Sequence, residues 1–172
     1  MAAVILGIDP GFSVTGFSVI KQAPGSTSVL DFGYLKLSSQ KTLAERVGEF
    51  YALFQSKIHH FGVTDIALET SFLGQNAQTF LKLGYLRGIL YLLADQHKCT
   101  LHEFAPREVK QAVTGTGGAS KEQVALMLHR IFPQLNTLGA AVKNDVTDAL
   151  AIGLCGIWSL QQKALMAKIA KL

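Results

Sequence analysis

The sequence opens on a short apolar run that ends in an acid and a turn, and this arrangement limits the possible folds most. Val4 to Ile8 is apolar, and Asp9-Pro10-Gly11 follows directly. Such a run before Pro-Gly is typical of a buried strand that ends at a turn. An ionised carboxylate at the end of a buried strand is costly unless it is hydrogen-bonded, paired with a cation or bound to a metal. We therefore expect a sheet with acidic chemistry at one end.

The rest of the chain indicates a mixed α/β order. Apolar alternation predicts strands, and apolar residues at helical spacing predict helices. Further strands are expected at 15–20, 29–37, 64–69 and 100–104, and helices at 43–54, 76–96, from Pro106, from a Ser120 cap to 131, and from an Asn144 cap. Three antiparallel strands followed by helical crossovers to parallel strands predict a ribonuclease-H-like fold, with a five-stranded mixed sheet flanked by helices.

Three further acids join Asp9 as candidate metal ligands. Glu69 ends the apolar strand 64–69, while Asp145 and Asp148 lie three apart on the last predicted helix and so project from one face. Each acid also has an ordinary interpretation. Asp9 suits a turn, Glu69 could be a surface residue at a strand end, and Asp145 suits the helix dipole of a first turn. Asp148 is harder to dismiss, because it lies closer to the apolar part of its helix. Spacing alone does not establish that the four converge.

Four acids on separate elements suit two Mg²⁺ ions, which Mn²⁺ could replace. Magnesium prefers a few carboxylates together with water and phosphate oxygens. Two such ions favour in-line hydrolysis of a phosphodiester. The five histidines are scattered, and Cys99 and Cys155 are far apart, so neither a zinc site nor a disulfide framework is indicated. The net charge of +4 suits a polyanionic partner only weakly.

Length and composition are consistent with one nuclease domain. The 172 residues suggest a domain at 1–158 followed by a basic tail or helix at 159–172. No basic leader precedes a long apolar core, and the apolar stretch 149–160 is too short to cross a membrane. We therefore expect a cytoplasmic protein.

Four segments, in order, resemble RuvC-type Holliday junction resolvases. The resemblance covers roughly residues 4 to 155, and agreement of several blocks in spacing is specific. It rests on Gly7-Ile8-Asp9-Pro10-Gly11 with Thr15-Gly16, on Glu69 with Phe72, Asn76, Leu81–Gly84 and Arg87-Gly88, on Pro106–Lys110 with Gly115, Gly117 and Lys121, and on Asp145–Ala151.

The resemblance implies a role for each matched residue. Asp9, Glu69, Asp145 and Asp148 would be catalytic metal ligands. Among the remaining matches, Phe72 would be the aromatic that inserts at the junction, and Lys110 and Lys121 would lie near the scissile phosphate. The family implies a homodimer that nicks four-way junction DNA symmetrically and works with the RuvA–RuvB branch-migration complex. We expect the dimer to form through the helix at 76–96, where Gly84 and Gly88 lie beside Leu81, Leu92 and Leu93.

Several residues keep a second interpretation. A loop phenylalanine such as Phe72 usually folds onto the core, and lysines are usually solvated. Phe12 and Ser18 depart from the family pattern near Asp9, where a small hydroxyl residue and glycine are usual. His102 lies in a strand and could line the site.

Two other functions are compatible with parts of the pattern. An RNA nuclease of the YqgF type shares the first strand, although the matches at Phe72 and the lysines argue against it. A non-catalytic module that binds junctions or ATP is the alternative of a different class. A dead junction binder would be expected to have lost an acid, and a nucleotide clamp of the actin-like kind needs a duplicated domain.

Overall fold

The structure is a computed structural model that describes residues 2–70, 77–133, 135 and 144–170. It contains five strands and five helices within those ranges. In chain order they are β1 (Ala3–Asp9), β2 (Val14–Ala23), β3 (Ser26–Lys36), α1 (Leu43–Phe61), β4 (Asp65–Glu69), α2 (Ala77–His97), β5 (Thr100–Phe104), α3 (Pro106–Thr114), α4 (Lys121–Ile131) and α5 (Asn144–Ile169).

The strands form one mixed sheet in the order β3-β2-β1-β4-β5. β1, β2 and β3 pair antiparallel, while β4 joins β1 and β5 joins β4 in parallel. The five-stranded mixed sheet predicted from the sequence is confirmed, and with it the ribonuclease-H-like fold. Parallel pairing requires crossovers, which α1 and α2 provide.

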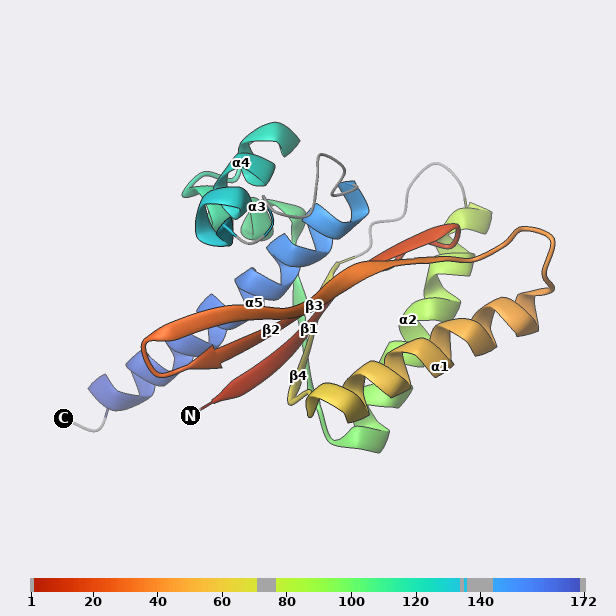
Figure 1. The fold of residues 1–172 in the computed structure, drawn as a ribbon, viewed down its shortest axis with the longest axis horizontal. Helices are drawn as coiled ribbons and strands as arrows, with labels where there is room; N and C mark the ends of the chain where they lie inside the picture. The colour runs from red at the N-terminus through yellow and green to blue at the C-terminus, as the bar shows by residue number, and fades with distance from the viewer. Residues whose placement is uncertain (1, 71–76, 134, 136–143, 171–172) are drawn as a thin grey trace.

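Helices cover both faces of the sheet (Figure 1). α1 and α2 pack on one face and α5 on the other, with α3 and α4 beside α5. Side chains alternate along a strand, so β1 contributes to both cores. Ile5 packs in the core under α5, and Leu6 and Ile8 pack in the core under α1 and α2.

Backbone contact at glycine positions brings α5 unusually close to the sheet. A Cβ on Gly7 would lie 2.5 Å from the Ala149 carbonyl oxygen and 2.5 Å from the Gly153 nitrogen. A Cβ on Gly16 of β2 would lie 1.9 Å from the Asp145 carbonyl oxygen. Only glycine fits at such distances, so the first half of α5 rests directly on β1 and β2.

The helices begin within one residue of the starts expected from the sequence, whereas α1 ends at Phe61, seven residues beyond its expected end. Ser120 caps α4 as expected, and Pro106 is the first residue of α3. α3 continues through Thr114 and is capped by Gly115. Asn144 lies inside the first turn of α5 instead of capping it. α5 runs unbroken to Ile169, so the basic tail described up to that residue is the end of the same helix. In the described ranges, no helix is both long and apolar enough to cross a membrane.

Candidate active site

The two strand acids are neighbours at one end of the sheet. Asp9 is the last residue of β1 and Glu69 the last residue of β4. The strands are parallel, and their last register pair is Ile8 with Leu68, which leaves Asp9 and Glu69 side by side one residue further on. Because side chains alternate, both carboxylates follow Gly7 and Ala67 toward the α5 face.

The two helix acids lie in the first turns of α5. Asp145 follows the first residue of the helix, and Asp148 is one turn further on. Gly16, whose backbone meets the Asp145 carbonyl, is the register partner of Asp9 across the β1–β2 pair. This contact brings the start of α5 beside the end of β1.

Acids from three separate elements line one cavity of about 370 Å³. Its walls combine carboxylates, amines and apolar side chains, namely Asp9, Glu69, Pro106, Val109, Lys110, Lys121, Val124, Asp148 and Ala151. Asp145 is not among these lining residues. Its charge nevertheless raises the pKa of Asp9, so it lies within electrostatic reach of that carboxylate.

Burial and mutual repulsion destabilise the charged forms of the acids. Burial first, and then the charges of Asp148, Glu69 and Asp145, raise the pKa of Asp9 from its ordinary 3.8 to about 7. Burial and Asp148 also raise the pKa of Glu69. A cluster of carboxylates whose charges oppose one another is stabilised by any cation that enters it.

Two lysines supply positive charge at the same cavity. Lys121 Nζ lies 3.0 Å from Asp148 Oδ2, and this hydrogen bond raises the pKa of the ammonium. Lys121 is the first residue of α4, whose N-cap Ser120 accepts a hydrogen bond from the Gln123 amide. Lys110 lies on α3, and its charge partly offsets the rise in the pKa of Glu69. The structure therefore brings Lys110 and Lys121 to the same cavity as the acids.

The donor set fits a hard divalent cation better than a soft one. Its ligands would be carboxylate oxygens, which Mg²⁺ and Mn²⁺ prefer. Within the described residues, no three histidine, cysteine, aspartate or glutamate side chains form a preassembled metal cage. Magnesium does not require one, because it usually keeps several waters and binds one or two carboxylates with substrate phosphates. Burial of Asp9 and, after it, repulsion from the neighbouring acids destabilise the free carboxylate and so favour binding of a cation.

Three other residues singled out from the sequence are not among those described at the acidic cavity. Phe72 and Asn76 lie outside the described residues. His102 does not line the acidic cavity, since its Nε2 lies 2.8 Å from Asp65 Oδ1 and both residues are buried. Asp65 begins β4, at the end of the sheet remote from Glu69.

The two departures from the family pattern each have a local partner. The guanidinium carbon of Arg46 lies 3.8 Å from the centre of the Phe12 ring, and Arg46 also donates a hydrogen bond to the Phe12 carbonyl. The Ser18 hydroxyl reaches α5, where it donates to the carbonyl oxygen of Ala149. Asp9 is the last residue of β1.

One residue near the acids lies in a segment that resembles the family, but no role of its own was expected for it. Arg87 of α2 donates a hydrogen bond to the backbone carbonyl of Glu69. Its sequence signals were the matched pair Arg87-Gly88 and its place on a predicted helix rich in apolar residues, and neither identifies its partner.

Comparison with known proteins places the chain in a family. Residues 5–156 match the family model described as crossover junction endodeoxyribonuclease RuvC. A protein of that name from Chlorobium phaeobacteroides is 45% identical over 161 residues, which cover 94% of this chain and 84% of the relative.

Two solved structures of Thermus thermophilus RuvC have the same fold. RuvC alone gives a TM-score of 0.82 at 31% identity, over 93% of this chain and 96% of the other. RuvC in complex with Holliday junction substrate gives 0.85 at 30% identity, over 94% and 96%. The family match over residues 5–156 and the 45% identical relative show that the chain belongs to the RuvC family of crossover junction endodeoxyribonucleases.

Proposed function

We propose that this protein resolves Holliday junctions by hydrolysing phosphodiesters symmetrically in four-way junction DNA during recombination and repair. One observation carries the proposal: acids from β1, β4 and α5 line a single cavity together with two lysines. Relatives carry the name crossover junction endodeoxyribonuclease, and T. thermophilus RuvC is known in complex with a Holliday junction substrate.

We propose Asp9, Glu69, Asp145 and Asp148 as the ligands and catalytic acids. Nucleases of this family depend on metal, and the carboxylate set supports Mg²⁺, with two ions per site and Mn²⁺ as a substitute. Held by these carboxylates, such ions would supply the Lewis-acid chemistry that activates a water and stabilises a leaving oxygen. Burial and the neighbouring acids raise the pKa of Asp9 to about 7, so a cation bound in this cavity would favour the ionised carboxylate.

Substrate binding is assigned to Lys110, Lys121 and Phe72. Lys110 and Lys121 line the acidic cavity, where an ammonium can bind a phosphate oxygen beside the bond to be cut. Phe72 follows Glu69 by three residues. Its proposed role is to stack on an unpaired base at the junction, an interaction worth about 1–3 kcal/mol.

A homodimer through α2 would give two equivalent sites for two symmetric nicks. α2 is apolar on both faces. Leu86, Leu90 and Leu93 are buried in the core, whereas Phe80, Leu81, Tyr85, Tyr91 and Leu92 are exposed. Leu93 is thus part of the core and not of the expected dimer surface. Open space surrounds Gly84 and Gly88, so a second backbone can approach there.

Sedimentation tests the dimer. The wild-type protein is expected to sediment as a dimer at micromolar concentration, and Leu81→Asp is expected to produce monomers that still bind junctions. A monomeric wild type with full junction activity would remove α2 as the dimer surface.

The cellular setting follows from the substrate. We propose a cytoplasmic protein, because the substrate is chromosomal DNA and both cysteines are free and buried. RuvA–RuvB is the proposed branch-migration partner, on the strength of the family resemblance.

Cleavage of a synthetic four-way junction tests the function. We expect two symmetric nicks in the junction with Mg²⁺, none with EDTA, and little cutting of a linear duplex of the same sequence. Equal cutting of junction and duplex, or of an RNA hairpin in preference to both, would contradict the proposal.

Substitution of the acids tests the site. Asp9→Asn, Glu69→Gln, Asp145→Asn and Asp148→Asn should each abolish cleavage and leave junction binding largely intact, because phosphate contacts dominate affinity. Asp95→Asn is the matched control, since Asp95 is exposed and forms its ion pair with an equally exposed lysine, Lys98. Robust magnesium-dependent cutting by one of the four variants would remove that residue from the catalytic set.

A further inference from the structure

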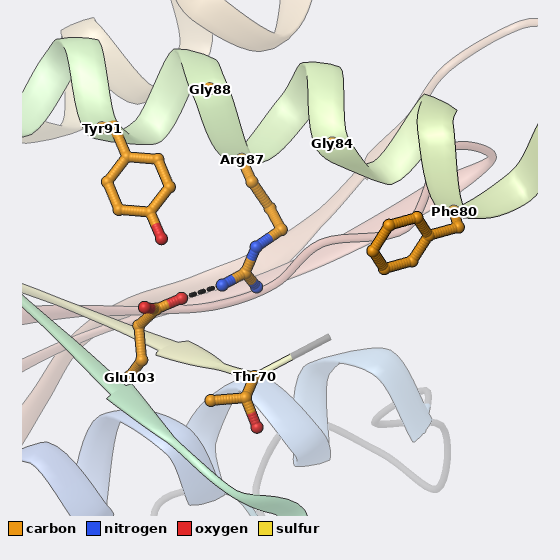
Figure 2. Close-up of a pocket in the computed structure, with 7 residues that line it drawn as sticks. All are labelled: Thr70, Phe80, Gly84, Arg87, Gly88, Tyr91 and Glu103. Atoms are coloured by element: carbon orange, nitrogen blue, oxygen red, sulfur yellow. Dashed lines mark hydrogen bonds and ion pairs between the residues drawn. The ribbon is translucent and has the colours of Figure 1, made fainter. Parts of the chain in front are cut away.

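A second cavity lies between α2 and β5, next to Thr70 (Figure 2). It measures about 440 Å³ and is lined by Thr70, Phe80, Gly84, Arg87, Gly88, Tyr91 and Glu103. Figure 2 shows the Arg87 side chain reaching from the helix toward the strands, with Phe80 and Tyr91 on either side. The guanidinium is thus shielded, and the Arg87 side chain is only 13% exposed.

Arg87 makes two bonds from one guanidinium. Nη1 donates to the backbone carbonyl oxygen of Glu69 over 2.7 Å. Nη2 forms an ion pair with the carboxylate of Glu103 on β5. Arginine suits this task because its donors are held in a rigid planar fork, so one side chain can fix two acceptors at a set angle.

The carbonyl that Arg87 binds lies where the strand ladder ends. β1 and β4 pair as far as Ile8 with Leu68, so Glu69 is one residue beyond that ladder. On its other side Glu69 still pairs with Phe104 of β5. A hydrogen bond to this carbonyl fixes the peptide plane after Glu69, and the plane in turn fixes the direction in which the Glu69 side chain leaves the backbone.

We propose that Arg87 is a positioning residue for Glu69. By holding the Glu69 carbonyl, Arg87 orients the Glu69 carboxylate toward the metal-binding cavity. The inference rests on the proposed function, in which Glu69 is a ligand. Groups that orient a metal ligand commonly affect metal affinity or activity by about 10–100-fold, although they touch neither metal nor substrate.

The alternative is that Arg87 only ties α2 to β5 through Glu103. The two roles predict different effects of mutation. If Arg87 only links α2 to β5, its removal lowers stability alone. If it positions Glu69, its removal also weakens the binding of a divalent cation by the acids. Glu103→Gln separates them, because it removes the ion pair and leaves Arg87 free to donate to the Glu69 carbonyl.

The experiment compares Arg87→Met, Arg87→Lys and Glu103→Gln, with Arg130→Met as a control for the removal of one exposed positive charge. Mn²⁺ affinity is measured by calorimetric titration without DNA. Cleavage turnover is measured at saturating junction, junction affinity in EDTA, and folding by thermal melting. The Mn²⁺ titration reports on the acids independently of activity.

We expect Arg87→Met to weaken Mn²⁺ binding and lower turnover by about 10–100-fold, with junction affinity in EDTA unchanged. Arg87→Lys keeps one donor and should fall between Arg87→Met and wild type. Glu103→Gln should change Mn²⁺ affinity by no more than about threefold, because a partly exposed ion pair contributes little. Arg130→Met should match wild type throughout. If Arg87→Met does not fold, Arg87→Lys carries the test.

Wild-type Mn²⁺ affinity and turnover in a folded Arg87 variant would overturn the inference, as would equal reductions in Glu103→Gln and Arg87→Met. Failure of the proposed function has a different signature. In that case Glu69→Gln itself would bind Mn²⁺ and cleave normally. If Glu69→Gln is inactive and Arg87→Lys is unaffected, only the positioning role is wrong.

Discussion

The hydroxyl of Ser18 donates a 2.8 Å hydrogen bond to the carbonyl oxygen of Ala149, and both residues are completely buried. The bond joins β2 to α5 one residue after Asp148. A serine here is accommodated because Gly153 leaves room beside it: a Cβ on Gly153 would lie 2.7 Å from the Ser18 oxygen. Helix and strand are therefore linked by a polar contact inside an otherwise apolar interface.

Ser18→Ala should lower the free energy of unfolding by about 0.5–1.5 kcal/mol, the usual net contribution of one buried hydrogen bond. The substitution leaves Ala149 in α5 and does not move the acids of this helix, so cleavage should change little. Urea denaturation measures the stability, with Ser39→Ala as a control at an exposed serine. An unchanged midpoint would mean that the hydrogen bond contributes nothing.

Gly16→Ala should reduce cleavage far more than it reduces stability. Its Cβ would lie 1.9 Å from the Asp145 carbonyl oxygen, so the start of α5 must move away from β1. Misplacement of a catalytic group by about 1 Å can cost about 100-fold in rate. Gly48→Ala is the control, because a Cβ there meets nothing within 4 Å and alanine favours its helix. Full activity of Gly16→Ala would show that α5 tolerates the displacement.

The framework of the site was predictable because its signals are local. Asp9 and Glu69 each end a short apolar strand, and β1 and β4 pair in parallel, so their carboxyl ends meet at one edge. Asp145 and Asp148 were assigned to one helix from their spacing alone. The structure brings Asp9, Glu69 and Asp148 to one cavity, a convergence that spacing could not establish.

Contacts between distant elements were not predictable. Arg87 binds the Glu69 carbonyl because of where α2 packs along the sheet. That position depends on the packing of many side chains. The alternation of apolar residues does not reveal which face of α2 points inward, because this helix is apolar on both faces. For the same reason, Leu93 was assigned to the wrong face.

Asp9→Asn should stabilise the metal-free protein at pH 8 and leave it unchanged at pH 4. Burial and the neighbouring acids raise the pKa of Asp9 from 3.8 to about 7. The folded protein thus binds this proton more tightly than the unfolded chain, and the stability it contributes is lost as the pH rises from about 4 through 7. Asparagine carries no charge, so the variant should gain about 1–3 kcal/mol above pH 7.

Thermal melting in EDTA at the two pH values measures the effect. Added Mg²⁺ should raise the melting temperature of the wild type more than that of Asp9→Asn. A variant that melts below the wild type at pH 8 would show that the carboxylate is stabilised without a cation.

Lys110→Ala and Lys121→Ala should each slow cleavage and flatten the salt dependence of junction binding by about one unit of slope, because alanine neutralises no phosphate and so displaces no counterion from the DNA. Lys98→Ala is the control, since Lys98 is exposed and precedes β5 at the opposite end of the sheet. Binding measured between low and moderate salt gives the slope. Wild-type rate and slope in both variants would make these lysines ordinary surface charges.

Phe72→Ala should slow junction cleavage without changing the melting temperature or the salt slope, because a base stack releases no counterions. If Phe72 instead belonged to the core, the substitution would cost about 3–5 kcal/mol of stability. A melting curve therefore separates the two roles. A variant that melts far below the wild type would end the insertion hypothesis.

The close approach of α5 to β1 and β2 has a consequence for how the protein tolerates mutation. Glycine backbones at Gly7, Gly16 and Gly153 set the gap between helix and sheet. The separation of strand acids from helix acids is therefore a backbone dimension, which ordinary trimming of core side chains does not alter. Substitutions that shorten side chains in either core should therefore lower the melting temperature and leave the spacing of the catalytic acids unchanged.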